Sequence, residues 1–280
     1  MGWRLRIRHH TGFQYSGKVV ASYNEARLTP LTLSGQNTLE ARIEVKPGAT
    51  LTRYWDYWGT QVAAFDLHEE HEVLEVTGLS VVETSDARPI ESKATWVELD
   101  GVAVRDRFAE MLAATPLTTV DDSLAASAVQ LRNGSAPHEA ALAVADFVRT
   151  AVEYVPGATG VRTGAQEAFA QRSGVCQDIA HLTVAMLRGM GLPARYVSGY
   201  LHPDPDPALR QVAEGQSHAW VEWWAGEWTP WDPTNGVPVG ERHVVVARGR
   251  DYDDVPPLKG VYRGSPSTLL GVRVELERLA

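Results

Sequence analysis

The only cysteine of the chain stands where a helix is expected to begin. Cys176 follows Ser173-Gly174, which interrupts the preceding pattern, and apolar residues then recur at helical spacing up to Gly191 and Pro193. A thiol at a helix N-terminus faces unpaired backbone N–H groups and the positive end of the helix dipole, and both favour the nucleophilic thiolate. The alternative is a cysteine that only packs, because free cysteine is among the most buried residue types.

An aromatic-rich segment downstream is typical of a β-hairpin. Its two runs, 217–224 and 228–232, flank a short turn that contains Gly226. A three-residue turn ending at Gly226 sets Asp232 directly opposite His218, and a turn one residue later sets it diagonally opposite on the same face. Either register brings a carboxylate within reach of an imidazole, whereas an odd shift would send it to the other face.

A cysteine, a histidine and an aspartate in these settings are the parts of a catalytic triad. His218 would remove the thiol proton of Cys176 and later protonate the leaving amine, while Asp232 would hold the tautomer and orientation of the imidazole. Any one of the three alone would favour a structural role. Their combination favours nucleophilic catalysis on amides.

Three blocks of sequence carry a resemblance to a known family. They are GVCQDIAHL at 174–182, GLPARYVSGYL at 191–201, and SHAWVE at 217–222 with WDPTN at 231–235. In these blocks the chain resembles the transglutaminase-like superfamily, in particular its bacterial branch with an N-terminal β-domain. The resemblance implies a papain-like core with Cys176 as nucleophile, His218 as general base and acid, and Asp232 as orienting carboxylate.

The resemblance leaves the reaction open, because members of the superfamily include cross-linking enzymes, peptidases, deglycosylating amidases and inactive forms. We expect a cysteine-dependent amide hydrolase or acyl-transferase that forms a thioester with a peptide or protein substrate. Hydrolysis is the default, since water is always present as the second nucleophile. The alternative is a binding or scaffold protein that keeps the fold without turnover.

Other candidate site residues surround the predicted triad. The backbone N–H at the start of the helix is a natural donor to an oxyanion, and Tyr154 or the side chain of Gln177 could supply a second. Trp220 and Trp224 share the strand face of the hairpin histidine. The hypothesis is that one of them walls the cleft or receives the acyl substrate.

Composition is that of an ordinary soluble enzyme. A net charge of -9 disfavours nucleic acid or an anionic membrane as partner, because both need a basic footprint. No apolar run approaches the ~20 residues that cross a bilayer, and residues 3–8 alternate as a strand rather than forming a signal peptide. One cysteine excludes an internal disulfide. We expect a cytoplasmic protein without cofactor or metal, since the HEEH run at 68–71 does not match zinc-protease spacing. The oligomeric state stays open.

Alternation and helix signals predict an α+β protein in three parts. These are an N-terminal β-sandwich-like domain over 1–95, a helical connector over 96–134, and a transglutaminase-like core over 135–280 in which helices pack on an antiparallel sheet. The last strand is expected to present one apolar face, made by Leu270, Val272, Val274 and Leu276.

Overall fold

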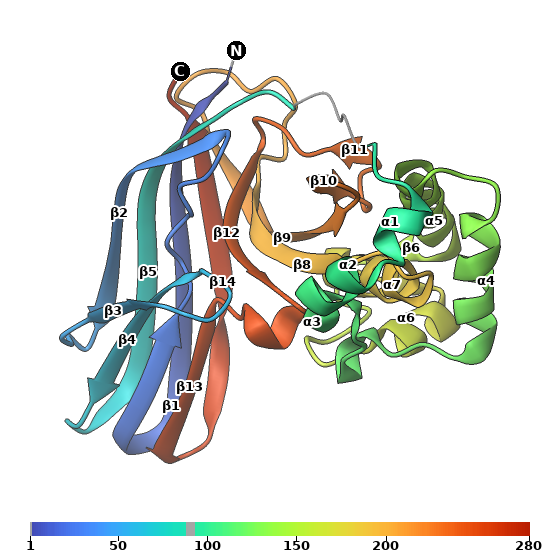
Figure 1. The fold of residues 1–280 in the computed structure, drawn as a ribbon. Helices are drawn as coiled ribbons and strands as arrows, with labels where there is room; N and C mark the ends of the chain where they lie inside the picture. The colour runs from blue at the N-terminus through green and yellow to red at the C-terminus, as the bar shows by residue number, and fades with distance from the viewer. Residues whose placement is uncertain (1, 88–92) are drawn as a thin grey trace.

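Long antiparallel strands lie beside a cluster of helices in the computed structural model, which describes residues 2–87 and 93–280 (Figure 1). The predicted α+β class is confirmed. The strands that precede the helices are β1 (Arg4–Ala26), β2 (Gln36–Lys46), β3 (Thr52–Trp55), β4 (Gln61–Leu67) and β5 (His71–Thr84).

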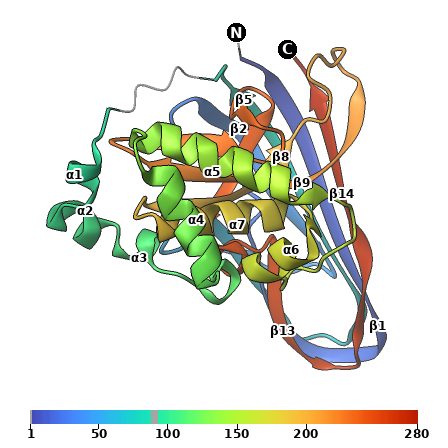
Figure 2. The same ribbon diagram turned by 90° about the vertical axis from the view of Figure 1, so that its right-hand side faces the viewer.

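The helices follow in one stretch of the chain. They are α1 (Trp96–Leu99), α2 (Val102–Arg107), α3 (Ala109–Leu112), the 3-10 turn η1 (Pro116–Thr118), α4 (Asp122–Arg132), α5 (Pro137–Ala151), α6 (Ala165–Gln171) and α7 (Cys176–Gly189). Helices α4, α5 and α6 cover α7 on the side away from the sheet (Figure 2). Helix α7 is therefore buried along almost its whole length, which matches its apolar sequence.

The remaining strands complete the molecule. They are β6 (Glu153–Tyr154), β7 (Ser173–Gly174), β8 (Ala194–Leu201), β9 (Val212–Trp224), β10 (Trp228–Asp232), β11 (Val237–Pro238), β12 (His243–Gly249), β13 (Leu258–Gly264) and β14 (Ser267–Arg278), with the 3-10 turn η2 (Tyr252–Asp254) before β13. Strands β13 and β14 fall within the predicted core range 135–280, yet both pair with β1.

Strand β9 connects the two parts of the sheet. Its first residues pair with β14, where Gly215 lies opposite Val274, and its later residues pair with β8, where His218 lies opposite Gly199. Through this strand, twelve of the described strands form one connected sheet, and only β6 and β7 pair separately. The β-domain and the predicted catalytic histidine thus share one continuous strand.

Two large apolar clusters fill the molecule. One surrounds α7 and includes Met186 and Trp223, because alternate residues of β9 point toward the helix. The other lies inside the β-domain around Phe65 and Leu74. Trp220, on the opposite face of β9, belongs to a smaller cluster with residues of the chain between β1 and β2.

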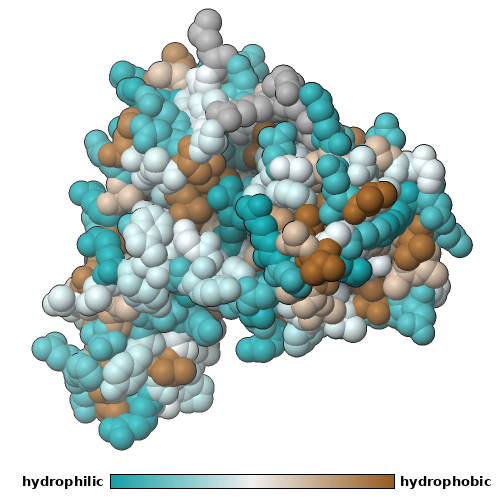
Figure 3. Space-filling model, viewed as in Figure 1, coloured by the Kyte–Doolittle hydropathy of each residue, from teal (hydrophilic) through white to brown (hydrophobic). Residues whose placement is uncertain are grey.

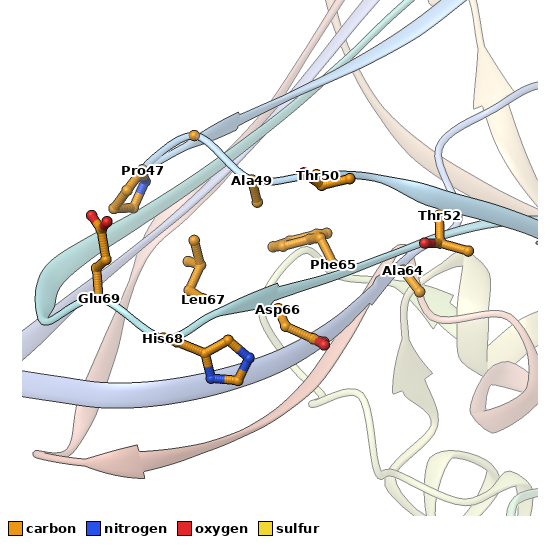
Figure 4. Close-up of a pocket in the computed structure, with 11 residues that line it drawn as sticks. Pro47, Ala49, Thr50, Thr52, Ala64, Phe65, Asp66, Leu67, His68 and Glu69 are labelled. Carbon is orange, nitrogen blue, oxygen red and sulfur yellow. The ribbon is translucent and has the colours of Figure 1, made fainter.

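The outer surface carries few features that indicate a site. Hydrophobic residues form small, separate groups among hydrophilic ones on the face shown in Figure 3. At the far end of the β-domain, a hollow of about 460 Å³ lies between residues 47–52 and β4, and His68 is among the residues that line it (Figure 4). His71 of the HEEH run is buried in β5, where its Nδ1–H donates to the carbonyl of Glu69 at 2.8 Å. No described helix has the length and apolar character that a bilayer crossing requires.

Candidate active site

The start of α7 is built around Cys176. The side chain of Asp178 turns back and accepts the N–H of Val175 at 2.8 Å and the hydroxyl of Thr159 at 2.5 Å. A Cβ at Gly174 would lie 2.9 Å from the Cβ of Asp178, so the glycine makes this close approach possible. Burial raises the pKa of Asp178, and the hydrogen bonds only partly offset that rise. The cysteine itself is half-buried at the helix start, as the sequence predicted.

The hairpin of β9 and β10 brings His218 and Asp232 together. Trp228 lies opposite Trp224, which is the predicted register that sets Asp232 diagonally opposite His218 on the same face. His218 Nε2 donates to Asp232 Oδ2 over 2.8 Å. The other ring nitrogen, Nδ1, is therefore left free of Asp232, and Cys176 lies close enough to His218 to contribute to its raised pKa.

The charges of this group follow from its contacts. Burial alone would lower the pKa of His218, but hydrogen bonds to Asp232 and to Cys176 outweigh it and raise the pKa to about 10. Burial would likewise raise the pKa of Asp232, but hydrogen bonds from His218 and His243 hold it well below its usual range. His218 therefore carries a proton at neutral pH, next to the sulfur of Cys176.

His243, which the sequence analysis did not single out, is a second imidazole on Asp232. The backbone N–H of Gly240 donates to His243 Nδ1 at 3.3 Å, so Nδ1 holds the lone pair and Nε2 the proton. That Nε2–H donates to Asp232 Oδ2 at 3.2 Å. Burial lowers the pKa of His243, which keeps the ring neutral. His243 thus acts on Asp232 as a neutral donor of fixed tautomer.

Both carboxylate oxygens of Asp232 accept several hydrogen bonds. Its Oδ1 accepts the N–H groups of Thr234 (3.0 Å) and Asn235 (3.1 Å), and its Oδ2 accepts the side-chain amide of Asn235 (2.7 Å) besides the two histidines. His218, Asp232 and His243 also lie near enough to one another to share a metal ion. In this network, however, both Nε2 atoms carry protons, so neither offers the lone pair that a metal requires.

A cavity of about 620 Å³ opens beside Cys176, and both predicted oxyanion candidates line it. Tyr154 is held there by the pairing of β6 with β7. Burial and the charge of the neighbouring thiolate raise the pKa of Tyr154, so its hydroxyl stays protonated and able to donate. The side-chain amide of Gln177 already donates to the carbonyl of Val161 at 3.2 Å. Both side chains therefore keep a donor at the cavity, the Tyr154 hydroxyl and the second N–H of the Gln177 amide.

Two family models match separate parts of the chain. Residues 125–233, which include Cys176, His218 and Asp232, match the transglutaminase-like superfamily, and residues 5–83 match the bacterial transglutaminase-like N-terminal region. The chain belongs to the transglutaminase-like superfamily.

Individual relatives agree with this assignment. An uncharacterized protein of Mycobacterium leprae is 48% identical over 278 residues, covering 99% of this chain and 100% of that protein. A protein-glutamine gamma-glutamyltransferase of Pseudomonas aeruginosa is 34% identical over 122 residues, covering 40% of this chain and 18% of that one. A Cytophaga hutchinsonii crystal structure, proposed to be a cysteine protease, has a TM-score of 0.79 at 23% identity, covering 100% of this chain and 92% of that one. It shares the fold.

In this transglutaminase-like protein, neither Trp220 nor Trp224 lines the cavity beside the cysteine. Trp220 is fully buried and packs edge-on against His243, with ring centroids 5.4 Å apart. Trp224 packs against Phe108 at 4.8 Å. This corrects the expectation that one of them receives the acyl substrate. Trp220 instead excludes water from the side of the hairpin where the carboxylate lies.

Proposed function

We propose that the protein is a cysteine-dependent amide hydrolase or acyl-transferase that acts on peptide or protein amides through a thioester. One observation carries the proposal. His218 hydrogen-bonds Asp232 through one ring nitrogen and, with Cys176, lines a cavity that opens at the sulfur. Membership of the superfamily supports the same reaction class.

Each step of the first half-reaction has a residue to perform it. The thiolate of Cys176 attacks the acyl carbon, and the electron pair of the carbonyl moves onto its oxygen. The N–H at the start of α7 and the hydroxyl of Tyr154, which line the same cavity, would stabilise that oxyanion. The carbon–nitrogen bond then breaks, and the imidazolium of His218 gives its proton to the leaving amine.

The second half-reaction reverses the role of His218. The neutral imidazole takes a proton from water or from an amine, which attacks the thioester carbon, and the thiolate of Cys176 leaves. Water gives a free acid, and an amine gives a new amide. Asp232 keeps the ring oriented through both steps, because its other contacts do not depend on the substrate.

A library of peptide amides, including glutamine-containing ones, tests this function with and without an added primary amine. Free acid alone at high amine concentration identifies a hydrolase, and amine conjugates formed at the expense of acid identify a transferase. Cys176→Ala should abolish all turnover while the unfolding temperature stays near that of the native protein. Turnover that survives in Cys176→Ala would overturn the proposal.

A further inference from the structure

One wall of the cavity beside Cys176 comes from the β-domain. The pairing of β1 with β14 sets Thr11 opposite Val272 and Phe13 opposite Leu269. These four residues, with His9 and Val274 further along the same pair, all line the cavity. Two neighbouring strands of the β-domain therefore present one face to the nucleophile.

A β-bulge decides which leucine belongs to this wall. Simple alternation from Val272 would put Leu270 on the cavity side. The register of β14 instead shifts at Gly271, whose φ of +124° suits glycine, and Leu269 takes the place opposite Phe13. Leu270 lies on the other face, where its Cδ1 would come within 3.4 Å of a Cβ at position 12. This corrects the apolar face predicted from the sequence.

The wall exposes apolar surface that packs against nothing described in the protein. Leu269 is 53% exposed and Val272 52% exposed, although both border the cavity. None of the described residues that line the cavity is an aspartate, glutamate, lysine or arginine. His9 is also uncharged at neutral pH, because burial, with the charge of His10, lowers its pKa to about 4. A charged group bound against this wall, away from His218 and Cys176, would lose its hydration without gaining an ionic partner.

We propose that this wall binds the acyl part of the substrate, so that the enzyme acts on amides whose acyl residue and its neighbours are uncharged and apolar. The inference rests on the proposed function, because it takes Cys176 as the atom that becomes acylated. The acyl part joins Cys176 in the first half-reaction and leaves it in the second, so it is the part that a cavity joined to the sulfur holds between the two. The β-domain is then a component of the substrate site, and its apolar strand face selects the substrate.

Alkylation of Cys176 tests this without a known substrate, since the chain has one cysteine. Three reagents are compared: iodoacetamide, N-hexyl iodoacetamide, and the hexyl reagent with a terminal carboxylate. The hexyl reagent should react about tenfold faster than iodoacetamide, because burying about two methylene groups is worth that factor. The carboxylate should remove most of this gain. Equal rates for the hexyl reagent and its carboxylate would overturn the proposal.

Two adjacent leucines provide matched variants. Leu269→Asp should remove most of the hexyl preference, whereas Leu270→Asp, which is as exposed but faces the other way, should keep it. Val272→Asp should behave as Leu269→Asp does and serves if that variant fails to fold. An equal loss of preference in the Leu269 and Leu270 variants would overturn the proposal.

The same measurements separate this proposal from the proposed function. One combination of results would contradict only the proposal that the wall binds the acyl part. In it, iodoacetamide reacts rapidly and more slowly with His218→Ala, but the hexyl reagent has no advantage. Reaction of iodoacetamide at the rate of an ordinary free thiol, unaffected by His218→Ala, removes the activated nucleophile and with it the proposed function.

Discussion

The two sides of the His218 ring lie in opposite environments. Behind Nε2, the buried carboxylate of Asp232 accepts five N–H groups from four residues. On the sulfur side, the cavity is lined without any charged carboxylate, lysine or arginine among the described residues. The polar side is complete before a substrate arrives, while the apolar side is left unfilled. The protein alone thus orients the ring of His218, and the cavity surface beside the sulfur is left for contacts with a substrate.

The largest expected effect comes from breaking the polar side at Asp232. Asp232→Asn should lower kcat by about 10²–10⁴, because an amide stabilises the wrong imidazole tautomer, as in serine triads. Hydrolysis of the best library substrate measures it, with thermal unfolding as the fold control. A kcat close to that of the native protein would show that the carboxylate does not orient His218.

A smaller effect should follow from removing the second imidazole. His243→Leu should lower kcat by about tenfold, roughly the value of one hydrogen bond to a buried charge, and leave KM unchanged. His243→Gln should recover part of the loss, because its amide can still donate to Asp232. A purely structural role for His243 would give no such recovery at equal stability, and this outcome would contradict the expectation.

The last prediction concerns stability rather than turnover. His218 has a folded-state pKa of about 10, above its unfolded value of 6.5, so its stabilising contribution is complete below pH 6.5. That contribution is lost as pH rises from 6.5 toward 10, at roughly 1.4 kcal/mol for each unit of pKa shift. Urea unfolding across this range should therefore show a smaller decline for His218→Gln than for the native protein. Parallel declines would mean that the ring is not held charged.

Local sequence signals predicted the part of the site that comes from neighbouring residues. Glycine before Cys176 and helical spacing after it identified the start of α7. For the hairpin, both registers considered kept Asp232 on the face of His218, and the structure has the diagonal one. The two-residue period of a strand was enough to predict that His218 and Asp232 share a face, because only an odd shift in register would have separated their side chains.

The features of the site that the sequence could not predict depend on strands that pair across long separations in the chain. His243 reaches Asp232 because β12 pairs with β8, and nothing in the run around His243 signals that neighbour. The bulge at Gly271 reverses the faces of two adjacent leucines, and alternation cannot detect it. Trp220 shares the face of His218, yet a segment from the β-domain covers it.

The shared strand β9 also limits how the β-domain can move relative to α7. Gly215, bonded within the β-domain, and His218, beside the nucleophile, are three residues apart in one hydrogen-bonded strand. Swinging the β-domain away from α7 would break ladder bonds on both sides of this short stretch. Because of this shared strand, we expect the gap between the apolar wall and the sulfur of Cys176 to keep a nearly constant width. If the protein acts on peptide or protein amides as proposed, we expect an extended chain to be a better substrate than a bulky folded protein.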